Sequence, residues 1–278
     1  MDIIQAIIIG IIQGLTEFLP VSSSGHLLFI QHFLNVSDSS LAFDTLVHLA
    51  TLVAVVSFFY KDILQLLHAW WLSIGDILQK RFQEGVKKDP YKRVAWFVLA
   101  ASIPVGLIGV LFKSQVEGIF NAGLYIPAFF LFVTGTILYL SQRINNPSVT
   151  FENMGIKETI FVGLAQACAI LPGLSRSGTT IAAGLVIGLD KEFAAKFSFI
   201  LSIPAILGAI LVQAKDIGAS MDTNFLAMLF GFLAALISGY LAIKWVLQLI
   251  QNKSLDIFAY YCWIVGILVF MASITNII

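Results

Sequence analysis

The 278-residue chain has few charged residues: Asp, Glu, Lys and Arg make up only 12% of it, about half the share typical of soluble domains. Its 16 basic and 16 acidic residues give a formal net charge of zero, so no global basic field exists to hold nucleic acid. The two cysteines, Cys168 and Cys262, lie in apolar runs without metal-ligand spacing. A nucleic-acid-binding protein, a disulfide scaffold, a zinc site and redox chemistry are therefore excluded.

Hydrophobic residues take the place of the missing charge, at 59% of the chain. A helix that crosses a bilayer needs about 20 mostly apolar residues. At least six stretches qualify, near residues 43–60, 94–113, 125–142, 193–214, 224–248 and 256–276. Alternating short apolar strands are absent, so the sequence predicts an all-α integral membrane protein with about six transmembrane helices.

Two further segments, residues 3–34 and 158–190, each contain an apolar run, a proline, a Ser/Gly-rich break and a second apolar run. We expect re-entrant helical hairpins, because broken helices occur at membrane depth only where protein or a polar cavity surrounds them. A shift of 153 residues superposes the two without a gap: Gly10, Gln13, Ser22, Ser24 and Gly25 fall on Gly163, Gln166, Ser175, Ser177 and Gly178. The pattern predicts one membrane domain, 1–278, built from inverted repeat halves of about 1–142 and 158–278.

The loop over residues 61–93 is the only sizeable polar segment. Its tryptophans and isoleucines alternate with charges, which indicates an amphipathic helix at the membrane interface. Placing this loop on the cytoplasmic side also puts most of the basic residues there, as the positive-inside rule requires.

Three ionisable residues, Glu17, His26 and Arg176, lie inside the broken segments, where buried charge is costly. Arg176 could reach an interface instead, but apolar runs flank it on both sides, which favours an anion clamp. A lone histidine is usually a structural one, yet His26 follows three serines and lies nine residues after Glu17. The other histidines, His32, His48 and His68, have no comparable cluster of polar residues beside them in the sequence, and we interpret them as structural.

Hydroxyl side chains crowd both breaks. Ser22 and Ser175 each precede an apolar helical run and are expected to cap it, while Gly25 and Gly178 allow close backbone approach. The remaining hydroxyls need a polar partner at membrane depth: Ser23, Ser24, Ser177, Thr179 and Thr180. Two helix N-termini that meet near the midplane suit an anion such as phosphate, and Arg176 adds a charged fork for its oxygens.

Both breaks resemble the signature motifs of a known family. They read Gln13-Gly-Leu-Thr-Glu17 followed by Phe-Leu-Pro-Val-Ser-Ser-Ser-Gly-His26, and Pro172-Gly-Leu-Ser-Arg-Ser-Gly-Thr-Thr180. These motifs resemble those of the undecaprenyl-pyrophosphate phosphatases of the BacA/UppP type, whose first motif opens with Glu or Gln. The chain length, the spans and the inverted duplication are similar to that family over the whole sequence.

The resemblance implies a membrane phosphatase that hydrolyses undecaprenyl pyrophosphate to undecaprenyl phosphate and inorganic phosphate. Such an enzyme recycles the lipid carrier for cell-wall (peptidoglycan) synthesis, confers bacitracin resistance and lies in the bacterial cell (inner) membrane. The alternative is a lipid-carrier flippase or anion transporter, because inverted repeats with broken helices are a transporter architecture. A nucleophile and a base opposite Arg176 favour the phosphatase, since a translocator has less need of them.

The expected catalytic residues are Glu17, Ser23, His26 and Arg176. Either Ser23 attacks with His26 or Glu17 as base, or His26 attacks and forms a phosphohistidine that water hydrolyses. Glu17 orients or deprotonates the nucleophile, or holds a divalent cation, Mg²⁺ or Ca²⁺, that accompanies the pyrophosphate; no organic cofactor is expected. The expected substrate-binding residues are Gln13, Ser22, Ser24, Ser175, Ser177, Thr179 and Thr180. The sequence leaves open whether the protein forms a homodimer.

Overall fold

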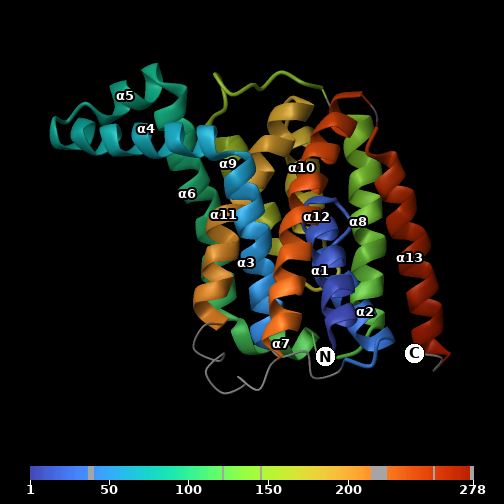
Figure 1. The fold of residues 1–278 in the computed structure, drawn as a ribbon. Coiled ribbons are helices and arrows are strands. Elements are labelled where there is room, and N and C mark those ends of the chain that lie inside the picture. The colour runs from blue at the N-terminus through green and yellow to red at the C-terminus, as the bar shows by residue number, and fades with distance from the viewer. Residues whose placement is uncertain (37–40, 121, 145, 214–223, 253, 276–278) are drawn as a thin grey trace.

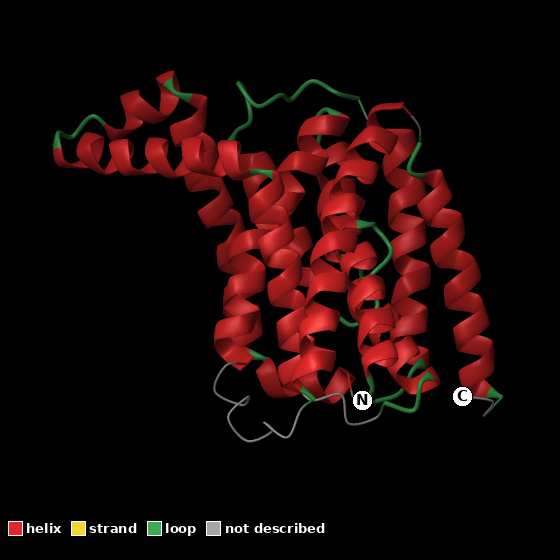
Figure 2. Cartoon of the chain, viewed as in Figure 1, coloured by secondary structure: helices red, strands yellow, loops and turns green. Residues whose placement is uncertain are grey.

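The computed structural model describes the chain except for residues 37–40, 121, 145, 214–223, 253 and 276–278. Its described residues form thirteen helices and no strand (Figures 1 and 2). An isolated bridge between Val149 and Leu189 ties the loop before α9 (Ile156–Cys168) to the loop after α10 (Arg176–Val186). The all-α prediction is confirmed.

Six of the described helices are long and apolar enough to cross a membrane. They are α3 (Leu41–Phe58), α6 (Pro90–Leu111), α8 (Tyr125–Ile144), α11 (Lys191–Gln213), α12 (Phe225–Asn252) and α13 (Asp256–Ile274). Large apolar side chains cover their outer surfaces, and Leu111, Leu211 and Leu268 are each exposed by 64% or more. Helices that are apolar on the outside as well as the inside are typical of membrane spans, and the chain is a multi-pass membrane protein.

The two broken segments form helical hairpins whose turns lie in the middle of the bundle (Figure 2). The first consists of α1 (Ile3–Phe18) and α2 (Ser23–Phe33), and the second of α9 and α10. In both, the second helix begins 20 residues after the first, and α9 and α10 follow α1 and α2 by 153 residues. Figure 1 shows the first hairpin inserting from the end that carries the N-terminus and the second from the opposite end.

The two halves exchange packing partners. Helix α1 packs against α12 of the second half, and α9 packs against α6, the corresponding helix of the first half. In the same way α3 packs on α12 while α11 packs on α6, and α8 lies against α13. Because each hairpin is held by the other half, the tips of both meet inside one core.

Helices α4 (Tyr60–Leu78) and α5 (Phe82–Lys88) form an arm that projects sideways from the bundle (Figure 1). The arm confirms the helix predicted in residues 61–93. Several large apolar side chains of α4 are exposed, among them Leu64 at 61%, Trp71 at 69% and Leu78 at 81%. The short helix α7 (Lys113–Phe120) lies at the other end of the bundle (Figure 1).

Candidate active site

Each hairpin turn ends in a serine that caps the following helix. Ser22 Oγ accepts a hydrogen bond from the Gly25 amide at 3.3 Å, and Ser175 Oγ accepts one from the Gly178 amide at 3.0 Å. Both predicted caps are confirmed. Ser22 has φ 70° and ψ 99°, a conformation that is costly for a residue other than glycine. The chain therefore tolerates backbone strain where α2 begins.

The two hairpin tips touch each other. Ser177 Oγ donates to the Leu19 carbonyl at 3.0 Å, and the Gly173 amide donates to Ser24 Oγ at 3.4 Å. Gly173 has φ +88°, and a Cβ there would lie 2.1 Å from the Pro127 carbonyl oxygen, so only glycine fits. The hydroxyls predicted to bind substrate thus also join the two halves of the chain.

Glu17 is the hub of the site and lies in the last turn of α1. Its Oε1 accepts a hydrogen bond from Arg176 Nη2 at 2.6 Å. Its Oε2 accepts one from Ser23 Oγ at 2.7 Å and one from Gln13 Nε2 at 3.0 Å. The residue is only 7% exposed. The structure therefore brings four of the predicted site residues, from α1, α2 and α10, into one buried cluster.

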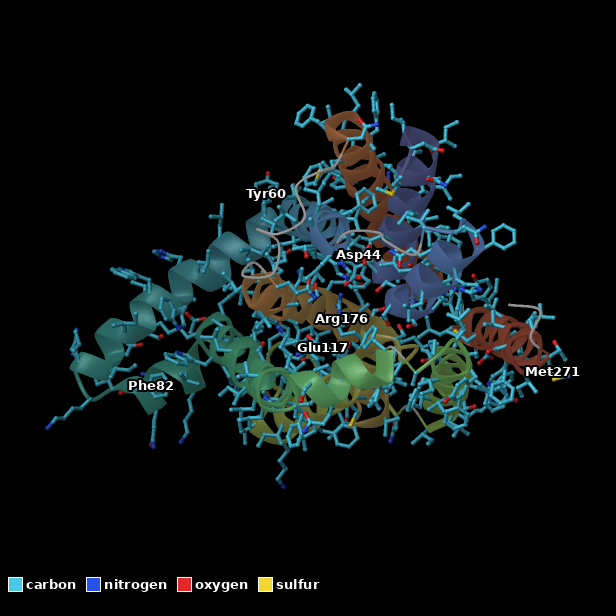
Figure 3. The ribbon with its side chains drawn as sticks, turned by 90° about the horizontal axis from the view of Figure 1, so that it is seen from below. Asp44, Tyr60, Phe82, Glu117, Arg176 and Met271 are labelled. Carbon is cyan, nitrogen blue, oxygen red and sulfur yellow. The ribbon has the colours of Figure 1, made fainter. Side chains whose placement is uncertain are left out.

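Arg176 is the first residue of α10 and lies near the middle of the helices when the bundle is viewed from below (Figure 3). Besides Glu17 it contacts the Ser198 carbonyl, at 3.4 Å from Nη1. Thr180 Oγ1 lies 2.6 Å from Ser198 Oγ, which fixes α10 against α11. Thr134 of α8 accepts from the Ser175 amide at 3.0 Å. Ser198 and Thr134 support the site, but they lie in predicted spans with no local signal.

His26 is turned toward α13. Its Nδ1 lies 2.8 Å from the Ser22 carbonyl and its Nε2 lies 2.8 Å from the Tyr261 hydroxyl, and the two rings stack with centroids 5.6 Å apart. A carbonyl accepts only, so Nδ1 carries the hydrogen and Nε2 of the neutral ring accepts from Tyr261. Both ring nitrogens are thus engaged away from the Glu17 cluster. The lone pair of Nε2 reaches a substrate only when the Tyr261 hydroxyl moves aside.

His48, interpreted from the sequence as structural, lies beside the cluster. Its Nε2 is 4.0 Å from Glu17 Oε2. An ionisable residue inside an apolar span is itself a signal of function, and that signal was present in the sequence.

Two buried side-chain oxygens on the hairpin helices, one on α1 and one on α10, have no partner in the described part of the chain. They are Gln13 Oε1 and Thr179 Oγ1, on residues that are 0% and 7% exposed. Buried polar atoms without partners are rare, and a ligand is a common reason for them. Among the described residues, no group of three or more His, Cys, Asp or Glu side chains could hold a metal ion.

The fold and the site together define an integral membrane protein with a buried cluster of polar and charged side chains between two oppositely inserted hairpins. A guanidinium, a carboxylate and a hydroxyl meet there within hydrogen-bond distance, and a hydroxyl bonded to a carboxylate can be deprotonated as it attacks. The chemistry that such a cluster can perform is nucleophilic displacement at a bound phosphoryl group.

Comparison with known proteins agrees with this class. The model of the family described as bacitracin resistance protein BacA matches residues 6–268. An undecaprenyl-diphosphatase of Methanobrevibacter smithii is 73% identical over 276 residues, covering 99% of both chains. The undecaprenyl-diphosphatase of Methanosphaera stadtmanae is 45% identical, and the match covers 99% of both chains. The undecaprenyl-diphosphatase of Desulforapulum autotrophicum is 40% identical, and the match covers 98% of this chain and 99% of that protein. The chain belongs to the BacA family.

Proposed function

We propose that this protein is an undecaprenyl-diphosphate phosphatase, which hydrolyses undecaprenyl pyrophosphate to undecaprenyl phosphate and inorganic phosphate. The observation that carries the proposal is the buried contact of Arg176, Glu17 and Ser23 between the hairpin tips, with distances of 2.6 and 2.7 Å. The names of full-length relatives support the same reaction. The product is the lipid carrier of cell-wall synthesis, and its recycling in the cell membrane accounts for bacitracin resistance.

The pyrophosphate binds where α2 and α10 begin. The first amides of a helix and its positive dipole end attract anions, and the two hairpins aim two such ends at one point. Arg176 supplies a permanent charge and two parallel donors for phosphate oxygens. The unpartnered Thr179 hydroxyl adds a donor from the same helix. The prenyl tail stays in the lipid and enters laterally between helices.

Ser23 is the better placed of the two candidate nucleophiles. Its hydroxyl already donates to Glu17 at 2.7 Å, whereas the free nitrogen of His26 accepts from Tyr261. Ser23 Oγ forms a bond to the terminal phosphorus, the bridging P–O bond breaks, undecaprenyl phosphate leaves, and the hydroxyl proton passes to Glu17. Water then attacks the phosphoserine, the Oγ–P bond breaks, and Ser23 regains a proton as phosphate departs.

A divalent cation is proposed as a companion of the pyrophosphate. The donor set fits a cation that the substrate brings with it, because Glu17 offers carboxylate oxygens and the pyrophosphate supplies the rest. When bound, such a cation would neutralise charge on the phosphoryl oxygens. A chelator should therefore slow hydrolysis, and added Mg²⁺ or Ca²⁺ should restore it.

The test is phosphate release from undecaprenyl pyrophosphate by the purified full-length protein in detergent. We expect turnover by the wild type and near-complete loss in Arg176→Ala and Ser23→Ala. Arg81→Ala, which changes an exposed arginine of the arm, is the matched control and should keep full activity. His26→Ala separates the two nucleophiles, since substantial remaining turnover would exclude a phosphohistidine. Lipid movement in liposomes without any hydrolysis would instead favour a flippase, for which inverted hairpins are a known architecture.

A further inference from the structure

The accessible side of the site is the side that faces α13. Ser23 and His26 lie three positions apart on α2 and therefore share one face of that helix. Both are partly accessible, whereas Glu17, which accepts from the Ser23 hydroxyl, is buried. His26 in turn contacts Tyr261 of α13. A lipid substrate that approaches Ser23 along this face of α2 must pass between α2 and α13.

The other sides of the cluster are covered by spans. Helix α3 brings His48 to 4.0 Å from Glu17, and α11 brings the Ser198 carbonyl to 3.4 Å from Arg176. Both helices also pack against other spans, α3 on α12 and α11 on α6. An entrance on either of these sides would require spans to separate, so the boundary between α2 and α13 is the less costly route.

Helix α13 stands at the edge of the bundle (Figures 1 and 3). Within the described chain its close packing is against α8, where a Cβ at Gly135 would lie 2.8 Å from the Ala259 carbonyl oxygen. Such backbone approach holds a pair of membrane helices together. Toward the first hairpin its described contacts are those of single side chains, such as Cys262 Sγ at 3.7 Å from the Pro20 carbonyl oxygen. The boundary with α2 can therefore open while α13 stays on α8.

Tyr261 joins α2 and α13 at the lipid-facing surface. Its hydroxyl donates to His26 Nε2 at 2.8 Å, and the two rings stack with an interplanar angle of 12°. The residue is nevertheless 42% exposed, and Ile264 and Leu268 of the same helix are exposed as well. A neutral hydrogen bond shifts an equilibrium by only about 2- to 10-fold, so this contact can break and form again readily.

A hydrocarbon chain fits the surroundings of this contact. The pyrophosphate has to reach Ser23, while the chain attached to it has to stay among apolar groups. Phe29 of α2, whose ring centroid lies 6.0 Å from that of His26, and the exposed aliphatic residues of α13 supply apolar surface on both sides. The two helices thus offer a path on which the head group enters the site and the chain remains in contact with lipid.

We propose that the prenyl chain of the substrate enters and leaves between α2 and α13, and that Tyr261 closes this entrance by bonding to His26 when no substrate is bound. The inference rests on the proposed function, which supplies the chain. As the chain passes, the Tyr261 hydroxyl leaves Nε2, so the lone pair of His26 becomes available to the pyrophosphate in the same movement. Tyr261 is therefore a positioning residue, which acts through His26.

The first test removes the hydroxyl and keeps the ring. Tyr261→Phe should raise kcat/KM for undecaprenyl pyrophosphate by about 2- to 10-fold, because the bond that breaks on entry is gone. The inhibition constant of inorganic pyrophosphate, which has no chain, should stay at the wild-type value. The matched control is Tyr260→Phe, a neighbouring exposed tyrosine whose ring packs toward Tyr139, and it should behave as the wild type. A folded Tyr261→Phe protein with kcat/KM at or below that of the wild type would overturn the inference.

The second test closes the entrance reversibly. Phe29→Cys and Tyr261→Cys, combined with Cys168→Ala, place two thiols on either side of His26, while Cys262 stays buried. A short reducible bifunctional thiol reagent should link them and abolish phosphate release, and reduction should restore it. Inorganic pyrophosphate should raise the unfolding temperature of the linked and the reduced protein alike, because the head-group site is intact in both. Each single-cysteine variant treated with the reagent is a control and should keep its activity.

The remaining outcomes separate the inference from the proposed function. Full turnover by the linked protein would overturn the inference, and so would a folded double variant that cannot be linked. Loss of the stabilisation by inorganic pyrophosphate on linking would also overturn it, since the link would then act on the head-group site and not on the path of the chain. A wild type that releases no phosphate would instead refute the proposed function itself.

Discussion

The crossing of α1 and α12 allows a sharp test of how the fold positions the site. The two helices approach through small residues, and a Cβ at Gly14 would lie 2.0 Å from Ser238 Oγ, 2.4 Å from the Ala235 carbonyl oxygen and 2.7 Å from the Gly239 amide. Small residues spaced by four allow such backbone contact in membrane helices. Gly14→Ala must therefore push the helices apart by about 1 Å to reach ordinary van der Waals separation.

The size of the effect follows from opposing contributions. Overpacking costs about 1–3 kcal/mol, while alanine gains about 1 kcal/mol over glycine in helix propensity, so we expect a net loss of up to about 2 kcal/mol. Glu17 lies three residues after Gly14 on the same helix, and a misplacement of about 1 Å can cost about 100-fold in rate. Activity should consequently fall more steeply than stability.

Thermal unfolding in detergent and phosphate release measure the two quantities. The matched control is Gly208→Ala in α11, where a Cβ meets nothing within 4 Å. The control should be as stable as the wild type or slightly more stable, with full activity. A Gly14→Ala protein with the unfolding temperature and turnover of the wild type would show that the close approach of α1 and α12 does not depend on a glycine at this position, and the reasoning would fail.

Two further predictions concern helix caps and are read by thermal unfolding. Ser22→Ala removes the α2 cap and keeps the left-handed φ of 70°, so it should lower the stability by about 1 kcal/mol. Ser22→Gly should be the more stable of the two variants, because glycine adopts that φ without strain. A Ser22→Ala protein more stable than Ser22→Gly would contradict the positive φ at this position. Asp89 caps α6 by accepting from the Tyr91 amide at 2.9 Å, and Asp89→Ala should cost about 1 kcal/mol with turnover unchanged, since the cap lies away from the hairpin tips.

The spans and hairpins were predictable because their signals are local. A long apolar run, a serine before a helix and a glycine at a tight turn each reflect the backbone's own requirements over a few residues. The duplication was visible for the same reason: the residues that repeat after 153 positions, such as Gln13 with Gln166, lie on helices that begin 153 positions apart. For Glu17 and Arg176 the sequence predicted only that the two hairpin tips meet, because the repeats are inverted. It did not predict the direct contact between the two side chains.

The surroundings of the site were less accessible to sequence reasoning. The partner of His26 is Tyr261, 235 positions away on α13, and nothing near either residue points to the other. Ser198 and Thr134 likewise carry no sign of their role in the sequence, because their contacts with Thr180 and Ser175 exist only through the packing of α10 against α11 and α8. The 4.0 Å approach of His48 to Glu17 was equally inaccessible, because the two residues lie on different helices and far apart in the sequence.

The two hairpins share a scaffold but divide the chemistry. With the same 153-residue shift, Ser23 falls on Arg176, Glu17 on Ile170 and His26 on Thr179, whereas the capping serines and the buried glutamines fall on each other. One hairpin therefore carries the acid and the hydroxyl, and the other carries the guanidinium. The 2.6 Å contact between Glu17 and Arg176 can form only when both are in place, so neither half can assemble the site alone. Inversion of the repeat is what allows two similar turns to bring opposite charges together in one cluster.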